Sequence, residues 1–229
     1  MKLHKISKKY NIYISEELDE SKNPAIYFRE KKIYYRFMDT LYIPKPVYKL
    51  STDFVIELNN IRDKYCNKVV DIPYNELIYK QTTHSVAKLL NVPSQILDFG
   101  CGKGSAFSWI DSVFPVAKVY GFDIRDIKPS KNYFKTNTGS INQRFPYPDN
   151  FFSVVFAFFV FHFFISDTQI EELRRIIKGD GFLAFNLINS SDFSIIDRLQ
   201  RAGFSMIKPI NFQTDKNSGV GSVFFVSKR

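Results

Sequence analysis

The chain has 229 residues, of which 45% are apolar, so it can bury a hydrophobic core for one or two domains. Its net charge of +9 favours contact with phosphates, acidic lipids or acidic substrates. Two cysteines exclude a disulfide framework, and without paired Cys/His spacing we expect no metal site. The first residues lead into no apolar segment of the secretory type, so we expect a cytoplasmic protein.

Residues 1–72 differ in composition from the rest of the chain. Residues 1–50 are rich in Tyr and Lys, and they hold five of the nine net positive charges. Two β-prone runs, 25–29 and 33–37, predict a hairpin, and residues 51–64 predict a helix. Tyrosines interleaved with basic residues can bind stacked bases and phosphates, or can form a solvated basic face. We interpret this segment as an N-terminal extension, either a scaffold or oligomer contact, or a lid or substrate wall.

From residue 73 to residue 229 the sequence alternates between helical and strand patterns, which indicates one α/β domain. Helices are expected at 75–90, 105–114, 168–177 and 191–202, and strands at 95–99, 117–122, 154–159, 181–187, 206–210 and 220–227. Strands that alternate with helices predict a parallel sheet covered on both faces. The last two strands are joined by a turn-rich loop without a helix, which predicts an antiparallel edge.

One apolar run, residues 151–165, tests whether the chain enters a membrane. It is 15 residues long and contains a Ser and a His. A membrane-spanning helix needs about 20 apolar residues. A buried strand running into its following loop fits the run better, and no membrane partner is expected.

The segment Ile96–Ser105, which reads ILDFGCGKGS, places a glycine-rich turn between a strand and a helix. Ligands in open α/β sheets bind at the carboxyl ends of strands, where glycines let the backbone approach the ligand. The spacing fits neither the dinucleotide motif Gly-x-Gly-x-x-Gly nor a phosphate loop. Asp98 before the turn favours a ligand with a cationic group.

This segment resembles the first motif of class I S-adenosylmethionine-dependent methyltransferases. Three further stretches resemble family motifs in the same order: VYGFD at 119–123, RFPYPDNFF at 144–152, and LRRIIKGDGFL at 173–183. The resemblance covers about residues 75–229. It implies a Rossmann-like, seven-stranded, mostly parallel sheet with helices on both faces and an antiparallel C-terminal edge.

The resemblance also implies that S-adenosyl-L-methionine is the cofactor. Asp98 would stand near its ammonium group, Asp123 would accept its ribose hydroxyls, and Ile124 would pack on its adenine. Residues 138–142 lack the family's adenine-binding acid, so Ser140 or Asn142 would have to replace it. The full expected cofactor-binding set is Asp98, Gly100, Cys101, Gly102, Gly104, Asp123, Ile124, Ser140, Ile141, Phe159 and Tyr79.

Two of these side chains, and one histidine, have more than one interpretation. Cys101 has no activating partner in the sequence, so we interpret it as a small residue beneath the cofactor. Tyr79 is a candidate cover over the cofactor. His162 follows the fourth strand of the predicted domain, and it is either the catalytic base for a hydroxyl acceptor or a packing residue among phenylalanines.

The predicted reaction is an in-line displacement that methylates oxygen or nitrogen of a small molecule. The acceptor site is expected near the loop after Phe159 and near residues 186–192. An RNA or protein methyltransferase, suggested by the charge, remains an alternative, although no N/D-P-P-Y/F tetrapeptide follows the fourth strand. A second alternative is a non-catalytic binding protein that keeps the fold. The oligomeric state stays open.

Overall fold

The structure is a computed structural model of the chain. It describes residues 2–17, 22–37, 40–46, 49–65, 72–90, 93–125, 135–138, 144–161, 163, 165–187, 194–213 and 220–228. The chain divides into two compact units, Met1–Asp71 and Ile72–Arg229.

The smaller unit contains an antiparallel sheet of five strands in the order β1-β2-β5-β4-β3. The strands are β1 (Leu3–Ser7), β2 (Ile12–Ser15), β3 (Ile26–Arg29), β4 (Lys32–Phe37) and β5 (Leu41–Ile43). β3 and β4 form the predicted hairpin, and their turn residues Glu30 and Lys31 have φ of 50° and 62°. Positive φ at both central residues is typical of the turn whose twist matches a two-residue hairpin.

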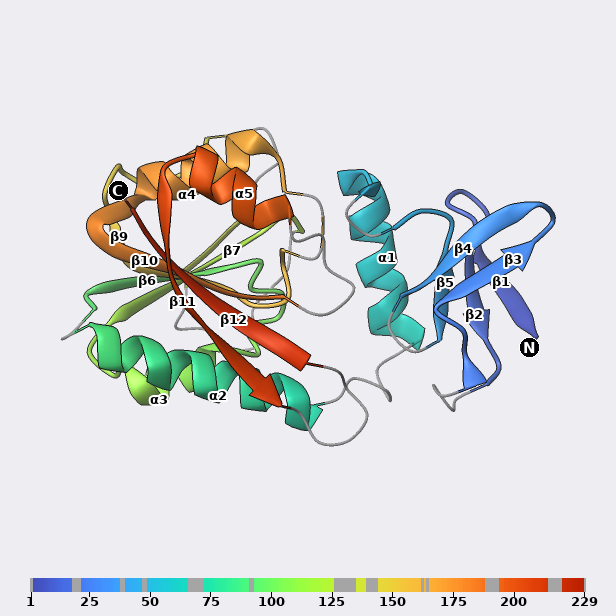
Figure 1. Cartoon of the computed structure of the whole chain (residues 1–229), viewed down its shortest axis with the longest axis horizontal. Coiled ribbons are helices and arrows are strands. Elements are labelled where there is room, and N and C mark those ends of the chain that lie inside the picture. The colour runs from blue at the N-terminus through green and yellow to red at the C-terminus, as the bar shows by residue number, and fades with distance from the viewer. Residues whose placement is uncertain are drawn as a thin grey trace. The chain divides into compact units, whose positions relative to one another are not determined.

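Helix α1 (Thr52–Tyr65) confirms the predicted helix and lies alongside this sheet (Figure 1). Its buried apolar residues follow the helical period, as expected for one packed face. They are Phe54, Val55, Leu58 and Ile61. The ring of Phe54 lies 4.6 Å from that of Tyr10, which links the helix to the β1–β2 turn.

The tyrosines of the smaller unit form a cluster on one face of its sheet. Tyr13, Tyr34 and Tyr42 are buried, and the rings of Tyr13 and Tyr34 meet edge to face at 5.1 Å. The Arg29 guanidinium lies 4.9 Å from the centre of the Tyr13 ring. Tyr13 and Tyr34 are therefore packing residues and are not exposed for base stacking.

The larger unit contains a seven-stranded sheet in the order β11-β12-β10-β9-β6-β7-β8. The strands are β6 (Gln95–Phe99), β7 (Lys118–Asp123), β8 (Lys135–Thr138), β9 (Phe152–Ala157), β10 (Ile177–Leu187), β11 (Phe204–Gln213) and β12 (Val220–Lys228). The five strands from β10 to β8 pair in parallel, and β12 pairs antiparallel with both β10 and β11. This confirms the predicted α/β class, the parallel sheet and its antiparallel edge.

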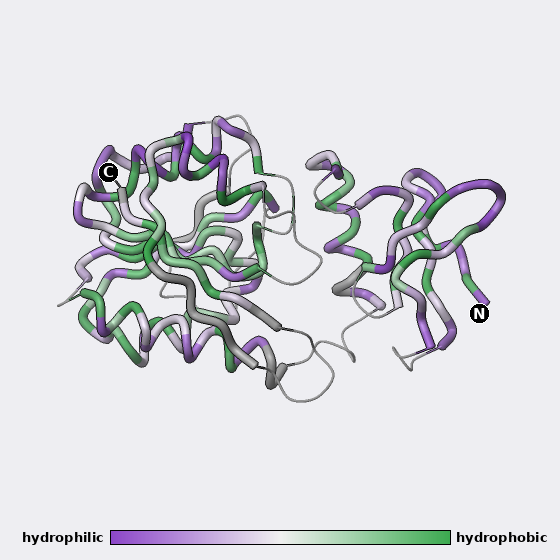
Figure 2. Tube along the Cα trace, in the orientation of Figure 1, coloured by the Kyte–Doolittle hydropathy of each residue, from purple (hydrophilic) through white to green (hydrophobic). Residues whose placement is uncertain are grey.

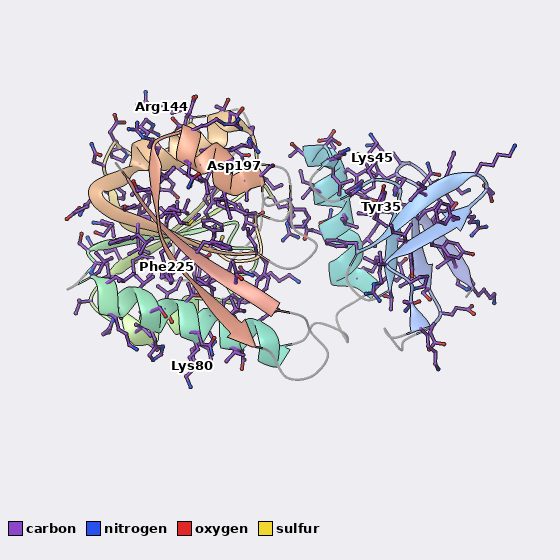
Figure 3. All side chains as sticks on the ribbon, viewed as in Figure 1. Tyr35, Lys45, Lys80, Arg144, Asp197 and Phe225 are labelled. Atoms are coloured by element: carbon purple, nitrogen blue, oxygen red, sulfur yellow. The ribbon has the colours of Figure 1, made fainter. Side chains whose placement is uncertain are left out.

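Helices cover both faces of this sheet. α2 (Ile72–Leu89) and α3 (Phe107–Val113) lie on one face, and α4 (Asp167–Ile176) and α5 (Ser194–Arg201) lie on the other (Figure 1). The hydrophobic residues run along the strands, while the helices alternate between hydrophobic and hydrophilic positions (Figure 2). Phe225 lies inside the unit, whereas Lys80 projects away from α2 (Figure 3).

Several elements differ from the sequence-based expectations. β8 was not expected, because the four polar residues of an edge strand carry no apolar signal. Helix α4 ends at Ile176, one residue before the end of the expected range 168–177, and β10 begins at Ile177 where the strand was expected from residue 181. Ile177 already has extended backbone angles and pairs with Phe152 of β9, so tertiary pairing ends the helix early. In the smaller unit, β1, β2 and β5 were also not expected.

Within the part of the chain that the structure describes, no helix combines the length and the apolar character needed to cross a membrane.

Candidate functional site

The glycine-rich turn leaves the carboxyl end of β6, the strand that lies between β7 and β9. The N–H groups of Gly100 and Cys101 both donate to the carbonyl of Phe122 in β7, at 2.7 and 3.2 Å. Gly100, Gly102 and Gly104 all have positive φ. The backbone therefore bends sharply at the carboxyl edge of the sheet, where open α/β proteins bind ligands.

Two of these glycines also leave no room for a side chain. A Cβ on Gly100 would lie 2.3 Å from Cγ2 of Val160, and one on Gly104 would lie 2.7 Å from the Phe107 ring. The Gly100 contact packs the segment after β9 directly onto the turn. The Gly104 contact fixes the start of α3 against the same turn.

The carboxylate of Asp123, at the end of β7, is bound to the backbone of the turn. Its Oδ2 accepts a hydrogen bond from the Gly102 N–H at 2.8 Å, and its Oδ1 accepts one from the Arg125 N–H at 2.9 Å. The Arg125 Nε lies 3.5 Å from the same Oδ1. A carboxylate has about four lone-pair sites, so Asp123 can accept further hydrogen bonds from a ligand.

The carboxyl group of Asp98 lies close to Asp123 and is buried, with the residue only 2% exposed. No residue in the described part of the chain donates a hydrogen bond to it. The pKa of Asp98 is raised to about 8, mainly by burial. The negative charge of Asp123 contributes in the same direction. A buried carboxylate without a partner is costly, so the site favours a cationic ligand.

Cys101 lies inside the turn and is buried. Burial raises the pKa of its thiol, and the negative charges of Asp98 and Asp123 act in the same direction. The thiol therefore stays protonated at neutral pH, and this cysteine lacks the thiolate that a nucleophile requires.

The segment after β9 closes this edge of the sheet. Phe159 has φ of 58°, which is strained for an aromatic residue, and its N–H donates to Oδ1 of Asn186 at 2.7 Å. The ring of Tyr79 on α2 meets Phe158 and Phe159 edge to face, at 4.9 and 6.1 Å. Tyr79 and Phe159 are therefore neighbours.

Residues 97–185, which span β6 to β10 and include the whole glycine turn, match the family model of the methyltransferase domain. These residues of the larger unit therefore have the sequence features of a methyltransferase domain. No curated protein matches the chain in sequence.

Solved structures share the fold of this methyltransferase domain at low sequence identity. The 1,6-didemethyltoxoflavin-N1-methyltransferase of Burkholderia thailandensis, solved with 1,6-didemethyltoxoflavin and S-adenosylhomocysteine, has a TM-score of 0.64 at 10% identity, covering 90% of this chain and 99% of that one. The N-methyltransferase NodS of Bradyrhizobium japonicum has a TM-score of 0.57 at 12% identity, covering 69% and 98%. The [4+2]-cyclase SpnF has a TM-score of 0.53 at 14% identity, covering 65% and 80%.

The family match supports the predicted methyltransferase. One structural relative of the same fold was solved with S-adenosylhomocysteine, the demethylated form of the predicted cofactor. The residues at the carboxyl edge fit that cofactor chemically. Asp98 offers a buried carboxyl without a hydrogen-bond donor among the described residues, and an ammonium group would stabilise its ionised form. Asp123 offers lone pairs beyond the two that the turn uses, which suits ribose hydroxyls.

The structure brings most of the predicted site residues to one edge of the sheet. Ile124 follows Asp123 and is half-buried. Ser140, Ile141 and His162 lie outside the described residues, so their roles stay predictions. Arg125, which pairs with Asp123, was not among the predicted site residues. Its only signal in the sequence is its position two residues after the acid that ends β7.

Proposed function

We propose that the chain binds S-adenosyl-L-methionine at the carboxyl edge of β6 and β7 and methylates a nitrogen or oxygen of a small molecule. The observation that carries this proposal is the buried Asp98 carboxyl, which lacks a hydrogen-bond donor among the described residues and stands beside the glycine turn. In this proposal Asp98 pairs with the ammonium group of the cofactor. Asp123 accepts the ribose hydroxyls while its bonds to Gly102 and Arg125 hold the turn in shape.

When bound, the cofactor supplies a methyl group on a positively charged sulfur, and the acceptor's lone pair forms the new bond as the carbon–sulfur bond breaks. Such a reaction depends mainly on positioning the two reactants in line. The chain's own contribution is therefore a rigid turn and a fixed wall. Val160 packs on Gly100, and Phe159 is held by Asn186.

The proposal of a small-molecule acceptor draws on the structural relatives. One of them was solved with the small molecule that its name gives as substrate, and a second is named an N-methyltransferase. An amine acceptor would need no base, because its lone pair is free when it is deprotonated. A hydroxyl acceptor would need one, and His162 remains the candidate for that role.

A competing function follows from the third relative. A protein of the same fold is named a [4+2]-cyclase, so the fold also occurs in a protein named for a different reaction. The buried carboxyl and the glycine turn would still hold the cofactor in such a protein. Cofactor binding and methyl transfer must therefore be tested separately.

The first test is calorimetric titration with S-adenosylhomocysteine, the demethylated cofactor. We expect saturable binding that Asp123→Ala weakens about tenfold or more, a loss of about 1.4 kcal/mol. Asp111→Ala is the matched control, because it removes an exposed carboxylate on α3 of the same unit. Equal affinity in all three proteins would contradict the ribose assignment.

The second test follows labelled methyl from the cofactor into an extract separated into small molecules, RNA and protein. Label in the small-molecule fraction supports the proposal. Label in RNA or protein instead would replace the proposed acceptor class. Intact binding of S-adenosylhomocysteine without transfer to any fraction would favour a function like that of the cyclase.

A further inference from the structure

The side-chain amide of Asn186 has a fixed orientation. A backbone N–H can only donate, so the atom that receives the Phe159 N–H at 2.7 Å must be the amide oxygen. The amide nitrogen, Nδ2, is then the other end of the group. Asn186 thus uses its acceptor to hold Phe159 in a strained backbone conformation and presents a donor elsewhere.

That donor is buried and has no acceptor among the residues that the structure describes. Asn186 is 1% exposed, and its Nδ2 is among the buried polar atoms of the described chain that make no hydrogen bond. Buried polar groups in native proteins are almost always paired. Leaving an amide donor unpaired is costly, and a bound ligand that accepted its hydrogen bond would recover that cost.

The register of the sheet shows on which face Asn186 lies. Asp98 of β6 pairs with Phe156 of β9, and Phe156 pairs with Ala184 of β10. Asn186 comes two residues after Ala184, and side chains two residues apart point to the same face of a strand. Asn186 therefore shares a face with Asp98, at the carboxyl end of β10.

Its place along the sheet separates Asn186 from the proposed ribose site. The strand order is β10-β9-β6-β7, and neighbouring strands lie about 4.8 Å apart. Asn186 thus stands about 14 Å along the sheet from β7, the strand that ends in Asp123. It adjoins the segment after β9, whose Val160 packs on Gly100. The proposed cofactor site lies at the carboxyl ends of β6 and β7, so Asn186 borders it on the β9–β10 side.

We propose that Nδ2 of Asn186 donates a hydrogen bond to the methyl acceptor. The acceptor molecule then carries a neutral hydrogen-bond-accepting atom, a carbonyl oxygen or an unprotonated ring nitrogen, near the atom that is methylated. Asn186 also positions Phe159 through its oxygen. This inference rests on the proposed function and adds the residue and the chemical feature by which the acceptor is recognised.

Asn186→Asp is the decisive variant, because it keeps an oxygen for the Phe159 N–H. Its carboxyl can replace the Nδ2 donor only while it is protonated. The probe is the small-molecule extract fraction that takes up labelled methyl. We expect the amount of this fraction needed for half-maximal labelling to rise at least tenfold for Asn186→Asp, relative to the natural protein, as the pH increases. Gln200→Glu, the same amide-to-acid change at an exposed position of α5, should follow the natural protein.

Two further readouts keep the inference separate from the proposed function. The affinity of Asn186→Asp for S-adenosylhomocysteine should stay within about threefold of the natural protein, or about 0.7 kcal/mol. The Asn186 side-chain amide resonance, identified by its absence in the variant, should move when the fraction is added to the S-adenosylhomocysteine complex. Unchanged half-maximal labelling at every pH, or an unmoved resonance, would overturn the inference. A natural protein that binds no S-adenosylhomocysteine would overturn the proposed function itself.

Discussion

Asp98 shows how burial changes the titration of a single side chain. Desolvation, and secondarily the charge of Asp123, raise its pKa to about 8, far above the value of about 3.9 in an unfolded chain. Between these two values the folded protein holds a proton that the unfolded chain has lost. The free energy of unfolding of the unliganded protein therefore decreases as the pH rises from about 4 to about 8.

Binding of S-adenosylhomocysteine should become tighter as the pH increases from 6 to 7.5. In the proposed site the ammonium group of the ligand pairs with an ionised Asp98, so binding must release the proton that this carboxyl holds below its pKa of about 8. The affinity should rise by up to about tenfold per pH unit. Titration calorimetry in two buffers with different ionisation enthalpies measures the proton release directly.

Asp98→Asn serves as the comparison for this prediction. The amide cannot ionise, so the variant should bind more weakly at pH 7.5 and lose most of the pH dependence. An unaltered pH profile in this variant would show that another group releases the proton.

At the scale of elements, hydrogen bonds and ion pairs join two of the four family-like motifs, residues 144–152 and residues 173–183. Arg175 at the end of α4 donates to the carbonyls of Phe145 and Tyr147 at 3.1 and 2.8 Å, and it forms a bidentate ion pair with Glu172. Glu172 in turn accepts the Phe145 N–H. Arg175 also pairs with Asp149 at 2.7 Å. The segment before β9 is thus clamped to α4, which indicates that these motifs stabilise the fold.

Arg175→Met should lower the free energy of unfolding by about 3–5 kcal/mol, since it leaves the largely buried Glu172 without its cation. Chemical denaturation followed by circular dichroism measures the change. Arg201→Met, at an exposed position of α5, should stay within about 0.5 kcal/mol of the natural protein. The clamp would be unimportant if both variants unfolded at the same denaturant concentration.

At the scale of the whole molecule, each of the two units has buried apolar residues of its own, and a different role is predicted for each unit. The described residues of the proposed cofactor site all lie in Ile72–Arg229. The smaller unit has its own buried core, with Leu58 fully buried on α1. Its role as scaffold or lid remains a prediction from the sequence.

Leu58→Ala should separate these two roles. Removal of a fully buried leucine costs about 2–5 kcal/mol of stability in its own core. If the smaller unit is a scaffold, the affinity for S-adenosylhomocysteine should change by less than about twofold, or about 0.4 kcal/mol. The control is Asn60→Ala at an exposed position of α1, and calorimetry measures both quantities. An affinity that falls together with stability would favour the lid.

The sequence alone determined the order of helices and strands in the larger unit and the place of the glycine turn, because burial imposes a repeating pattern on each element. It also predicted Asp98 and Asp123 as site residues and indicated the methyltransferase family. It did not reveal β8, the three extra strands of the smaller unit or the Arg175 clamp. Their polar or short segments carry no periodic signal of their own.

Only the tertiary structure decided how the site residues face one another. Three features of the site depend on atoms that are distant in the chain. They are the lack of a hydrogen-bond donor to Asp98 among the described residues, the contact of Val160 with Gly100, and the Asn186 Nδ2 that has no acceptor among those residues. Hydrogen bonds and close packing act over a few ångströms in space, and the spacing of residues along a sequence does not record such distances.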